Sequence, residues 1–298
     1  MADRLLDWSR QLHDGVGRMF GLPTVIRLSR LFDAAFPVVS LLVGAAVAGA
    51  FYDGRLWLLV VVVIMLNSAA MLWNDLEDRE IDADNDRHEV KQLSAGNRRL
   101  LKLYAVGFMA AGVALAMMVG LTALLLCALS IGAIWLYNSG PVQASRRPIL
   151  SVVTLSGAGA FLPFLLGVSL GGVSLLSIVA GVAWWGGRMS LSVLKDYKDV
   201  RGDARHGKKT FLLVFGRRRV AIVSIVSLIA GYGTVLALVW PGVSVMMAAA
   251  LLIGVVTLAF LRRPLFSGRA SYRQLDDKFR MLAQGQLWLD MGILLWLI

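Results

Sequence analysis

The chain has 298 residues, of which 58% are hydrophobic and only 16% are charged. Soluble globular domains usually have about 45–50% apolar residues, so this composition, with a mean hydropathy of +0.71, excludes an ordinary water-soluble protein. The formal net charge is +11, but the Lys and Arg residues lie between long apolar runs and not in a basic soluble domain. We therefore expect a chain whose loops alone meet water, with the lipid bilayer and no nucleic acid as a partner.

Residues 1–30 form the first segment. They combine five arginines with three aspartates and contain no long apolar stretch, so no cleavable signal peptide is predicted. Their apolar residues recur every three to four positions, which predicts an amphipathic helix on the cytoplasmic membrane surface. No domain boundary follows, and we predict a single transmembrane domain over residues 1–298.

The rest of the chain divides into apolar segments long enough to cross a membrane, which takes about 20 residues. Nine segments meet or nearly meet this test: 31–52, 56–75, 100–119, 121–139, 149–169, 173–194, 219–240, 243–261 and 281–298. The last is the least apolar, and its Asp290 has no evident role. The fold class predicted is an all-α polytopic membrane protein with about nine transmembrane helices.

The loop charges predict an orientation, because Lys and Arg accumulate on the cytoplasmic side. With the N-terminus inside, Arg55 is the only Lys or Arg in an outer loop. The loops after the second, fourth, sixth and eighth segments are then cytoplasmic. We expect the protein to lie in the plasma membrane of a prokaryote, with its active-site loops in the cytoplasm.

A first acidic cluster, Asn74 to Asp82, follows the second segment and reads N-D-L-E-D-R-E-I-D. If the helix continues through it, Asn74, Asp78 and Asp82 lie above one another on one face. These three side chains would bring oxygen ligands together at the cytoplasmic end of the helix.

A second acidic cluster, Asp196 to Asp203, follows the sixth segment. Its Asp196, Asp199 and Asp203 are spaced i, i+3 and i+7, again one helical face. Stacked carboxylates repel one another unless a positive charge lies between them, and Mg²⁺ prefers such oxygen ligands together with substrate phosphate. The alternative is that both clusters are solvated helix ends, but two in register on the same side favour a metal site.

The two clusters resemble the paired motifs of the UbiA superfamily of intramembrane prenyltransferases. The run from Lys195 to Gly216, with Gly207 and Thr210, is also similar to that superfamily's second motif and the loop after it. The resemblance implies a bundle around a central cavity, with two Mg²⁺ ions between the aspartates and a polyprenyl diphosphate. The allylic carbon–oxygen bond would ionise, and a small acceptor, for example an aromatic one, would capture the cation. From the sequence we expect no obligatory protein partner.

The resemblance also implies residue roles. The expected metal ligands are Asn74, Asp78, Asp82, Asp196, Asp199 and Asp203, of which Asp78 and Asp199, with Tyr137, are the expected catalytic residues. The expected diphosphate-binding residues are Asn74, Arg79, Lys91, Arg146, Arg147, Lys195 and Lys198. For Tyr137 and the basic residues, an interfacial aromatic and plain cytoplasmic charges are the alternative interpretations. Lys91-Gln92 departs from the Arg-Pro pair of many members.

Two other functions compete with prenyl transfer. A terpene cyclase of the same superfamily would use the same metal site and let the ionised chain cyclise without an acceptor. A cation transporter could use the acidic clusters as its pathway. The transporter is the weaker alternative, because it needs polar groups near the bilayer midplane, whereas the clusters lie at helix ends.

Overall fold

The computed structural model describes residues 31–84, 95–197, 199–239, 245–262, 265 and 271–298. Within these ranges the chain is helical and contains no β-strand. The amphipathic helix predicted over residues 1–30 lies outside the described residues and stays a prediction.

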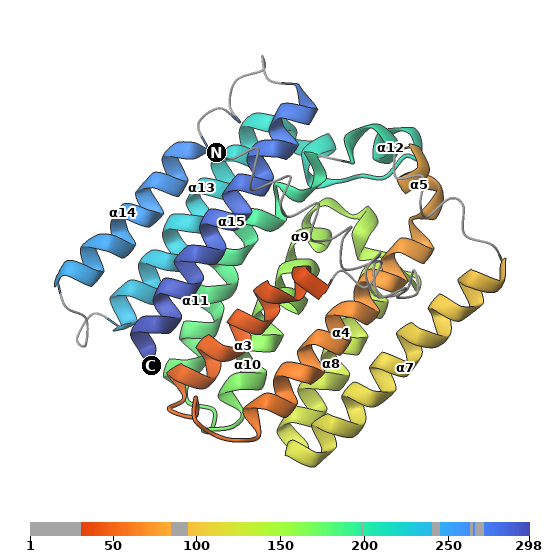
Figure 1. Cartoon of the computed structure of the whole chain (residues 1–298). Coiled ribbons are helices and arrows are strands. Elements are labelled where there is room, and N and C mark those ends of the chain that lie inside the picture. The colour runs from red at the N-terminus through yellow and green to blue at the C-terminus, as the bar shows by residue number, and fades with distance from the viewer. Residues whose placement is uncertain (1–30, 85–94, 198, 240–244, 263–264, 266–270) are drawn as a thin grey trace, which may run out of the picture.

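Each of the nine apolar segments coincides with helix in the described part of the chain (Figure 1). The long helices are α3 (Ala35–Val47), α4 (Leu56–Glu77), α7 (Ala95–Val119), α8 (Leu121–Asn138), α11 (Leu175–Ser192), α13 (Phe211–Val239), α14 (Val245–Leu261) and α15 (Tyr272–Leu297). The fifth segment comprises α9 (Pro148–Ser156), the π-helical turn η3 (Gly157–Phe161) and α10 (Leu162–Val168). Short helices connect them: η1 (Leu31–Ala34), α5 (Arg79–Asp84), η2 (Ala144–Arg146), η4 (Lys195–Tyr197) and α12 (Val200–Arg205).

The all-α membrane architecture is confirmed. Five described helical stretches are long and apolar enough to cross a membrane: Leu56–Glu77, Arg98–Val119, Leu121–Asn138, Pro148–Val168 and Phe211–Leu238. Two shorter apolar helices, Ala35–Val47 and Leu251–Leu261, accompany them. Nine crossings and a cytoplasmic N-terminus stay predictions.

The helices lie side by side along one common direction, with α4 packed along α7 and α11 along α13 (Figure 1). Glycines allow the closest approaches, as is usual between membrane helices. A Cβ on Gly44 of α3 would lie 2.0 Å from the carbonyl oxygen of Phe164 in α10. A Cβ on Gly231 of α13 would lie 2.1 Å from the backbone nitrogen of Gly187 in α11. Backbone therefore touches backbone at both interfaces.

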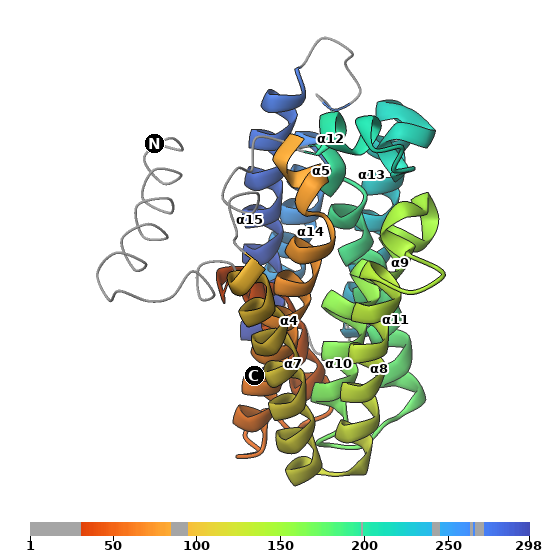
Figure 2. The ribbon, with the colours of Figure 1, turned by 90° about the vertical axis from the view of Figure 1, so that its right-hand side faces the viewer.

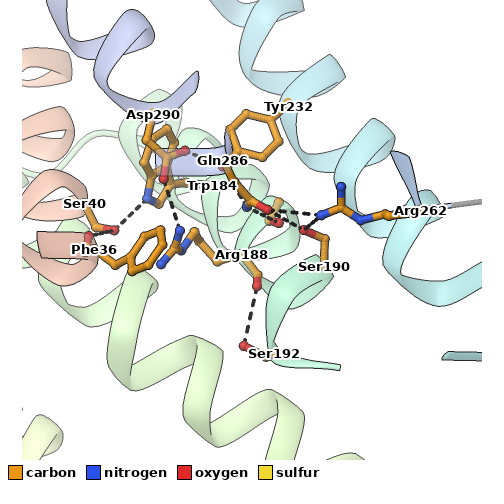
Figure 3. A network of polar contacts seen from close by, with 11 residues as sticks. Phe36, Ser40, Trp184, Arg188, Ser190, Ser192, Tyr232, Arg262, Gln286 and Asp290 are labelled. Carbon is orange, nitrogen blue, oxygen red and sulfur yellow. Dashed lines mark hydrogen bonds and ion pairs between the residues drawn. The ribbon is translucent and has the colours of Figure 1, made fainter. Parts of the chain in front are cut away.

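Two polar residues of α15, Gln286 and Asp290, are buried in a network that joins this helix to α11, α13 and Arg262 after α14 (Figure 3). Gln286 donates from Nε2 to the Tyr232 hydroxyl at 2.9 Å and to the Gly187 carbonyl at 3.0 Å. Its Oε1 accepts from Ser190 Oγ at 3.0 Å. Arg262, fully buried after α14, donates to Ser224 Oγ at 2.8 Å. Because the buried polar groups find hydrogen-bond partners, this polar face of α15 can pack inside the bundle.

The short helices α5 and α12 lie side by side at one end of the bundle (Figure 2). Each acidic cluster includes one of these helices: the first runs from the end of α4 into α5, and the second from η4 into α12. Asp84 of α5 lies 3.2 Å from His206 Nε2 and 3.8 Å from Arg205 of α12. These partly exposed pairs contribute little energy individually, but they link the two clusters at their outer edge.

Candidate active site

A polar pocket brings the two acidic clusters together, although they are more than 100 residues apart in the sequence. It is lined by Asn74, Asp78, Ile81, Asp82, Tyr137, Lys195, Asp196, Asp199, Asp203 and Lys208. All six expected metal ligands are in this set, as are Tyr137 and Lys195. Their assigned roles stay predictions, but the expected side chains share one pocket.

The first cluster does not continue as an unbroken helix, contrary to expectation. Helix α4 ends at Glu77, and Asp78 leaves helical backbone values (φ −91°, ψ 12°) before α5 begins at Arg79. The hydrogen bonds nevertheless keep the four-residue repeat: Asp78 N donates to Asn74 O at 2.9 Å, and Asp82 N to Asp78 O at 2.8 Å. The three side chains therefore still face one pocket.

The second cluster is also broken, so the prediction of a single helical face is wrong there. Asp196 lies in η4, and Asp199 precedes α12, which contains Asp203. Asp199 N donates to Asp196 O at 3.2 Å, and Asp203 N to Asp199 O at 3.0 Å. A tight turn of three residues followed by an α-turn of four matches the motif spacing, and all three carboxylates still line the pocket.

Lys208 is a pocket residue that the sequence analysis missed. Gly207 follows α12 with φ +64°, a left-handed conformation that favours glycine. Lys208 N donates to Asp203 O at 2.9 Å and Gly207 N to Ala204 O at 3.3 Å, the paired bonds of a glycine-terminated helix. This turn ends α12 and leaves Lys208 in the lining of the pocket. The signal available in the sequence was the glycine directly after a short helix.

Two ammonium groups lie among the carboxylates, that of Lys208 buried and that of Lys195 partly buried. Lys208 Nζ is 2.9 Å from Asp78 Oδ2 and 3.6 Å from Asp203 Oδ1. Lys195 Nζ donates to the Tyr137 hydroxyl at 2.6 Å and lies 3.3 Å from Asp196 Oδ1. Burial alone would lower the pKa of Lys208, but Asp78 and Asp203 outweigh it and raise the pKa above its ordinary value. Lys208 is therefore positively charged.

The pocket fits a divalent cation by the chemistry of its oxygens. Among the described residues no three acidic, His or Cys side chains form a ready-made metal site. However, Asp196 Oδ2 and Asp203 Oδ1 are buried without a hydrogen-bond partner in the described structure. Burial raises the pKa of Asp203 to about 6, although Lys208 opposes the shift. Buried carboxylate oxygens that accept no hydrogen bond are what Mg²⁺ would bind.

Asn138, also missed by the sequence analysis, supports the first cluster from α8. It is buried, and its Oδ1 accepts from Asn74 Nδ2 at 3.0 Å while its own Nδ2 donates to Ile134 O at 3.0 Å. Asn74 Nδ2 also donates to Asp78 Oδ2 at 3.1 Å. With its nitrogen engaged twice, Asn74 has Oδ1 left as a ligand atom.

Three of the remaining expected diphosphate-binding residues, Arg79, Arg146 and Arg147, are described and do not line the pocket. Arg79 lies 4.0 Å from Glu80, and Arg147 donates from Nε to Val142 O at 2.9 Å. Arg146 ends η2 and is likewise not a lining residue. Lys91 and Lys198 lie outside the described residues. Roles for these five residues stay predictions.

An apolar cavity lies along the same helices as the polar pocket. Its lining residues are Pro37, Val63, Leu66, Asn67, Ala70, Met71, Ser130, Ile134, Leu155, Ala158, Gly159, Pro163 and Leu166. Met71 on α4 is three residues from Asn74 of the polar pocket, and Ile134 on α8 is three residues from Tyr137. Residues at this spacing share a helix face, so the cavity and the polar pocket are one turn apart on both helices.

The comparisons with known proteins agree with this arrangement. The UbiA prenyltransferase family model matches residues 36–284. The digeranylgeranylglyceryl phosphate synthase of Thermococcus gammatolerans is 26% identical over 205 residues, 68% of this chain and 73% of the relative. The enzyme of the same name from Methanospirillum hungatei is 30% identical over 179 residues, 57% of this chain and 60% of the relative.

The fold is also shared with a solved structure, a UbiA homolog from Archaeoglobus fulgidus bound to GPP and Mg²⁺. The TM-score is 0.66 at 17% identity, covering 91% of this chain and 99% of the homolog. The family match, which spans most of the chain, and the relatives' names confirm the prediction of an enzyme that transfers prenyl groups. The chain is a prenyltransferase and belongs to the UbiA prenyltransferase family.

Proposed function

We propose that this protein transfers a prenyl chain from an allylic diphosphate to an acceptor at the polar pocket, with two Mg²⁺ ions held by the six clustered residues. The observation that carries the proposal is the convergence of both acidic clusters on one pocket, next to an apolar cavity on the same helices. Magnesium bound there would neutralise the charge that develops on the departing diphosphate.

The two lysines supply positive charge for the diphosphate oxygens. Lys195 and Lys208 both line the pocket, Lys208 buried and Lys195 partly buried, and an ammonium shielded from water attracts phosphate more strongly than one in water. The ring of Tyr137 lies 5.3 Å from Lys195 Nζ, measured to its centroid. An aromatic face at this position also suits the allylic cation that forms when the carbon–oxygen bond breaks.

The apolar cavity suits the hydrocarbon chain of the donor. Its lining residues are apolar except for Asn67 and Ser130, and sites for small molecules are typically apolar with a few polar groups. Apolar walls one turn from the diphosphate pocket would keep water away from the allylic cation, which water would otherwise capture to give an alcohol. The donor would thus lie with its diphosphate among the aspartates and its chain along α4 and α8.

The proposed acceptor is a hydroxyl of a glyceryl phosphate lipid. The support is the name of the relatives, digeranylgeranylglyceryl phosphate synthase. An aromatic acceptor is the competing choice, and the terpene cyclase alternative needs no acceptor at all. These three possibilities predict different products from the same donor.

The test uses the purified full chain with geranyl or geranylgeranyl diphosphate and Mg²⁺. Each donor is offered a prenylated glyceryl phosphate, an aromatic hydroxy acid or no acceptor. Diphosphate release and the organic products are measured, with EDTA and the Asp78→Asn and Asp199→Asn variants as controls. Prenyl ether formed only with the glyceryl phosphate supports the proposal. A cyclised product without acceptor indicates the cyclase, and release that survives both variants overturns the proposed site.

A further inference from the structure

Lys208 connects the two acidic clusters directly. Its ammonium group contacts Asp78, which belongs to the first cluster, and Asp203, which belongs to the second. The exposed fractions of the three side chains are 9%, 14% and 3%, so water screens these contacts weakly. The lysine therefore stands between carboxylates at the place where a cation is expected.

The charge balance of the pocket explains why such a lysine is needed. Five aspartates and two lysines line the pocket, and the aspartates repel one another when no metal is bound. Lys195 contacts Asp196 of the second cluster and Tyr137 of α8, and no contact with a carboxylate of the first cluster is among those described. Lys208 reaches across, so its loss would leave Asp78 and Asp203 facing each other without a positive charge between them.

We propose that Lys208 is an internal counter-cation that holds the two acidic clusters together before magnesium enters and competes with magnesium for Asp78 and Asp203. This inference rests on the proposed magnesium and diphosphate site. Once displaced, the ammonium needs a new anionic partner, and the diphosphate of the substrate provides one. Magnesium alone then binds weakly, and diphosphate strengthens the binding of magnesium. By linkage, magnesium strengthens the binding of diphosphate by the same factor.

The primary test measures Mg²⁺ binding to the purified full chain by titration calorimetry, without substrate. Lys208→Met keeps the length of the side chain and removes its charge. We expect it to bind Mg²⁺ at least about fivefold more tightly than the wild type, which is the lower end of typical coupling effects. Lys209→Met, at the neighbouring exposed position, is the matched control and should leave the affinity unchanged.

A second measurement distinguishes a counter-cation from a purely structural lysine. In EDTA, Lys208→Met should unfold at a lower temperature than the wild type, and added Mg²⁺ should close the difference. Inorganic diphosphate added with Mg²⁺ should bind more weakly to Lys208→Met, since the displaced ammonium is missing. A structural lysine would lower the unfolding temperature equally at all Mg²⁺ concentrations.

A third measurement needs no variant and holds even if Lys208→Met fails to fold. Acylation of lysines in the wild type is followed by mass spectrometry of the peptide that contains Lys208, with Lys209 as the internal reference. Mg²⁺ should increase the acylation of Lys208, because it releases the ammonium from its carboxylates.

The outcomes separate this inference from the proposed function. If the wild type binds no Mg²⁺ with or without diphosphate, the proposed function fails. If the wild type binds Mg²⁺ but Lys208→Met binds it no more tightly, or Mg²⁺ does not increase the acylation of Lys208, only the counter-cation role is overturned.

Discussion

Arg188 and Asp290 form an ion pair inside the bundle, with Arg188 Nη1 3.1 Å from Asp290 Oδ2 across 102 residues of sequence. The other oxygen of Asp290 accepts a hydrogen bond from the Tyr232 hydroxyl. The guanidinium of Arg188 also lies 3.9 Å from the centre of the Phe36 ring. The pair thus joins α11 to α15 and α3 and explains the acid in the ninth apolar segment (Figure 3).

Asp290→Leu should strongly destabilise the protein, because it leaves the buried Arg188 without its counter-charge. Breaking one partner of a buried pair typically costs about 3–5 kcal/mol, whereas replacing both partners by apolar residues is much milder. We therefore expect the double variant Arg188→Met/Asp290→Leu to unfold at a higher temperature than Asp290→Leu in detergent. Equal stability of the two variants would show that the pair is not coupled.

Asn138→Leu should weaken the use of magnesium without unfolding the protein. It removes the acceptor that holds Asn74 Nδ2, so Asn74 can turn its oxygen away from the pocket. We expect the Mg²⁺ concentration for half-maximal diphosphate release to rise by about fivefold to tenfold, equivalent to about one buried hydrogen bond.

Ser139→Ala is the matched control for Asn138→Leu. Ser139 adjoins Asn138 but bonds to Trp73 and Glu77 and not to Asn74. We expect Ser139→Ala to leave the Mg²⁺ requirement unchanged. If Asn138→Leu also leaves the Mg²⁺ requirement unchanged and alters only the unfolding temperature or the maximal rate, Asn138 does not position the Asn74 ligand.

Gly44→Ala should disrupt the packing of α3 against α10. The new Cβ would lie 2.0 Å from the Phe164 carbonyl oxygen, which is backbone and cannot rotate away. Overpacking of this kind costs about 1–3 kcal/mol or more. We expect a lower unfolding temperature and yield, whereas Gly107→Ala on α7, where nothing lies within 4 Å of the Cβ, should be neutral or stabilising. Equal behaviour of the two variants would contradict this close approach.

The helical segments could be predicted from the sequence because crossing a membrane imposes a length and a composition that are visible locally. The boundaries of α4 and α8 agree with the predicted segments to within two residues at each end. The breaks at Asp78 and around η4 were not predictable from spacing alone. They occur where side chains distant in sequence meet, as Lys208 and Asp78 do across 130 positions.

The residues of the pocket could be predicted where they belong to a sequence motif, and were missed where only tertiary packing brings them in. The acidic clusters are recognisable in the sequence by their spacing and charge. Asn138 and Lys208 sit in unremarkable local sequence, and only the fold brings them to Asn74 and Asp203. Asp290 could be recognised as unusual, but its partner Arg188 could not be chosen among the chain's 30 Lys and Arg residues.

Ala70→Phe should shift donor preference toward short prenyl chains, if the apolar cavity holds the donor's hydrocarbon as proposed. Ala70 lines the cavity on α4, and a phenyl ring there would occupy the space of several methylene groups. We expect the ratio of kcat/KM for geranyl diphosphate over geranylgeranyl diphosphate to rise by about tenfold or more, a typical effect of pocket size. Val61→Phe, at an exposed position of the same helix, is the control and should leave the ratio unchanged. An unchanged ratio in Ala70→Phe, with Mg²⁺-dependent turnover intact, would place the chain outside this cavity while leaving the diphosphate site in place.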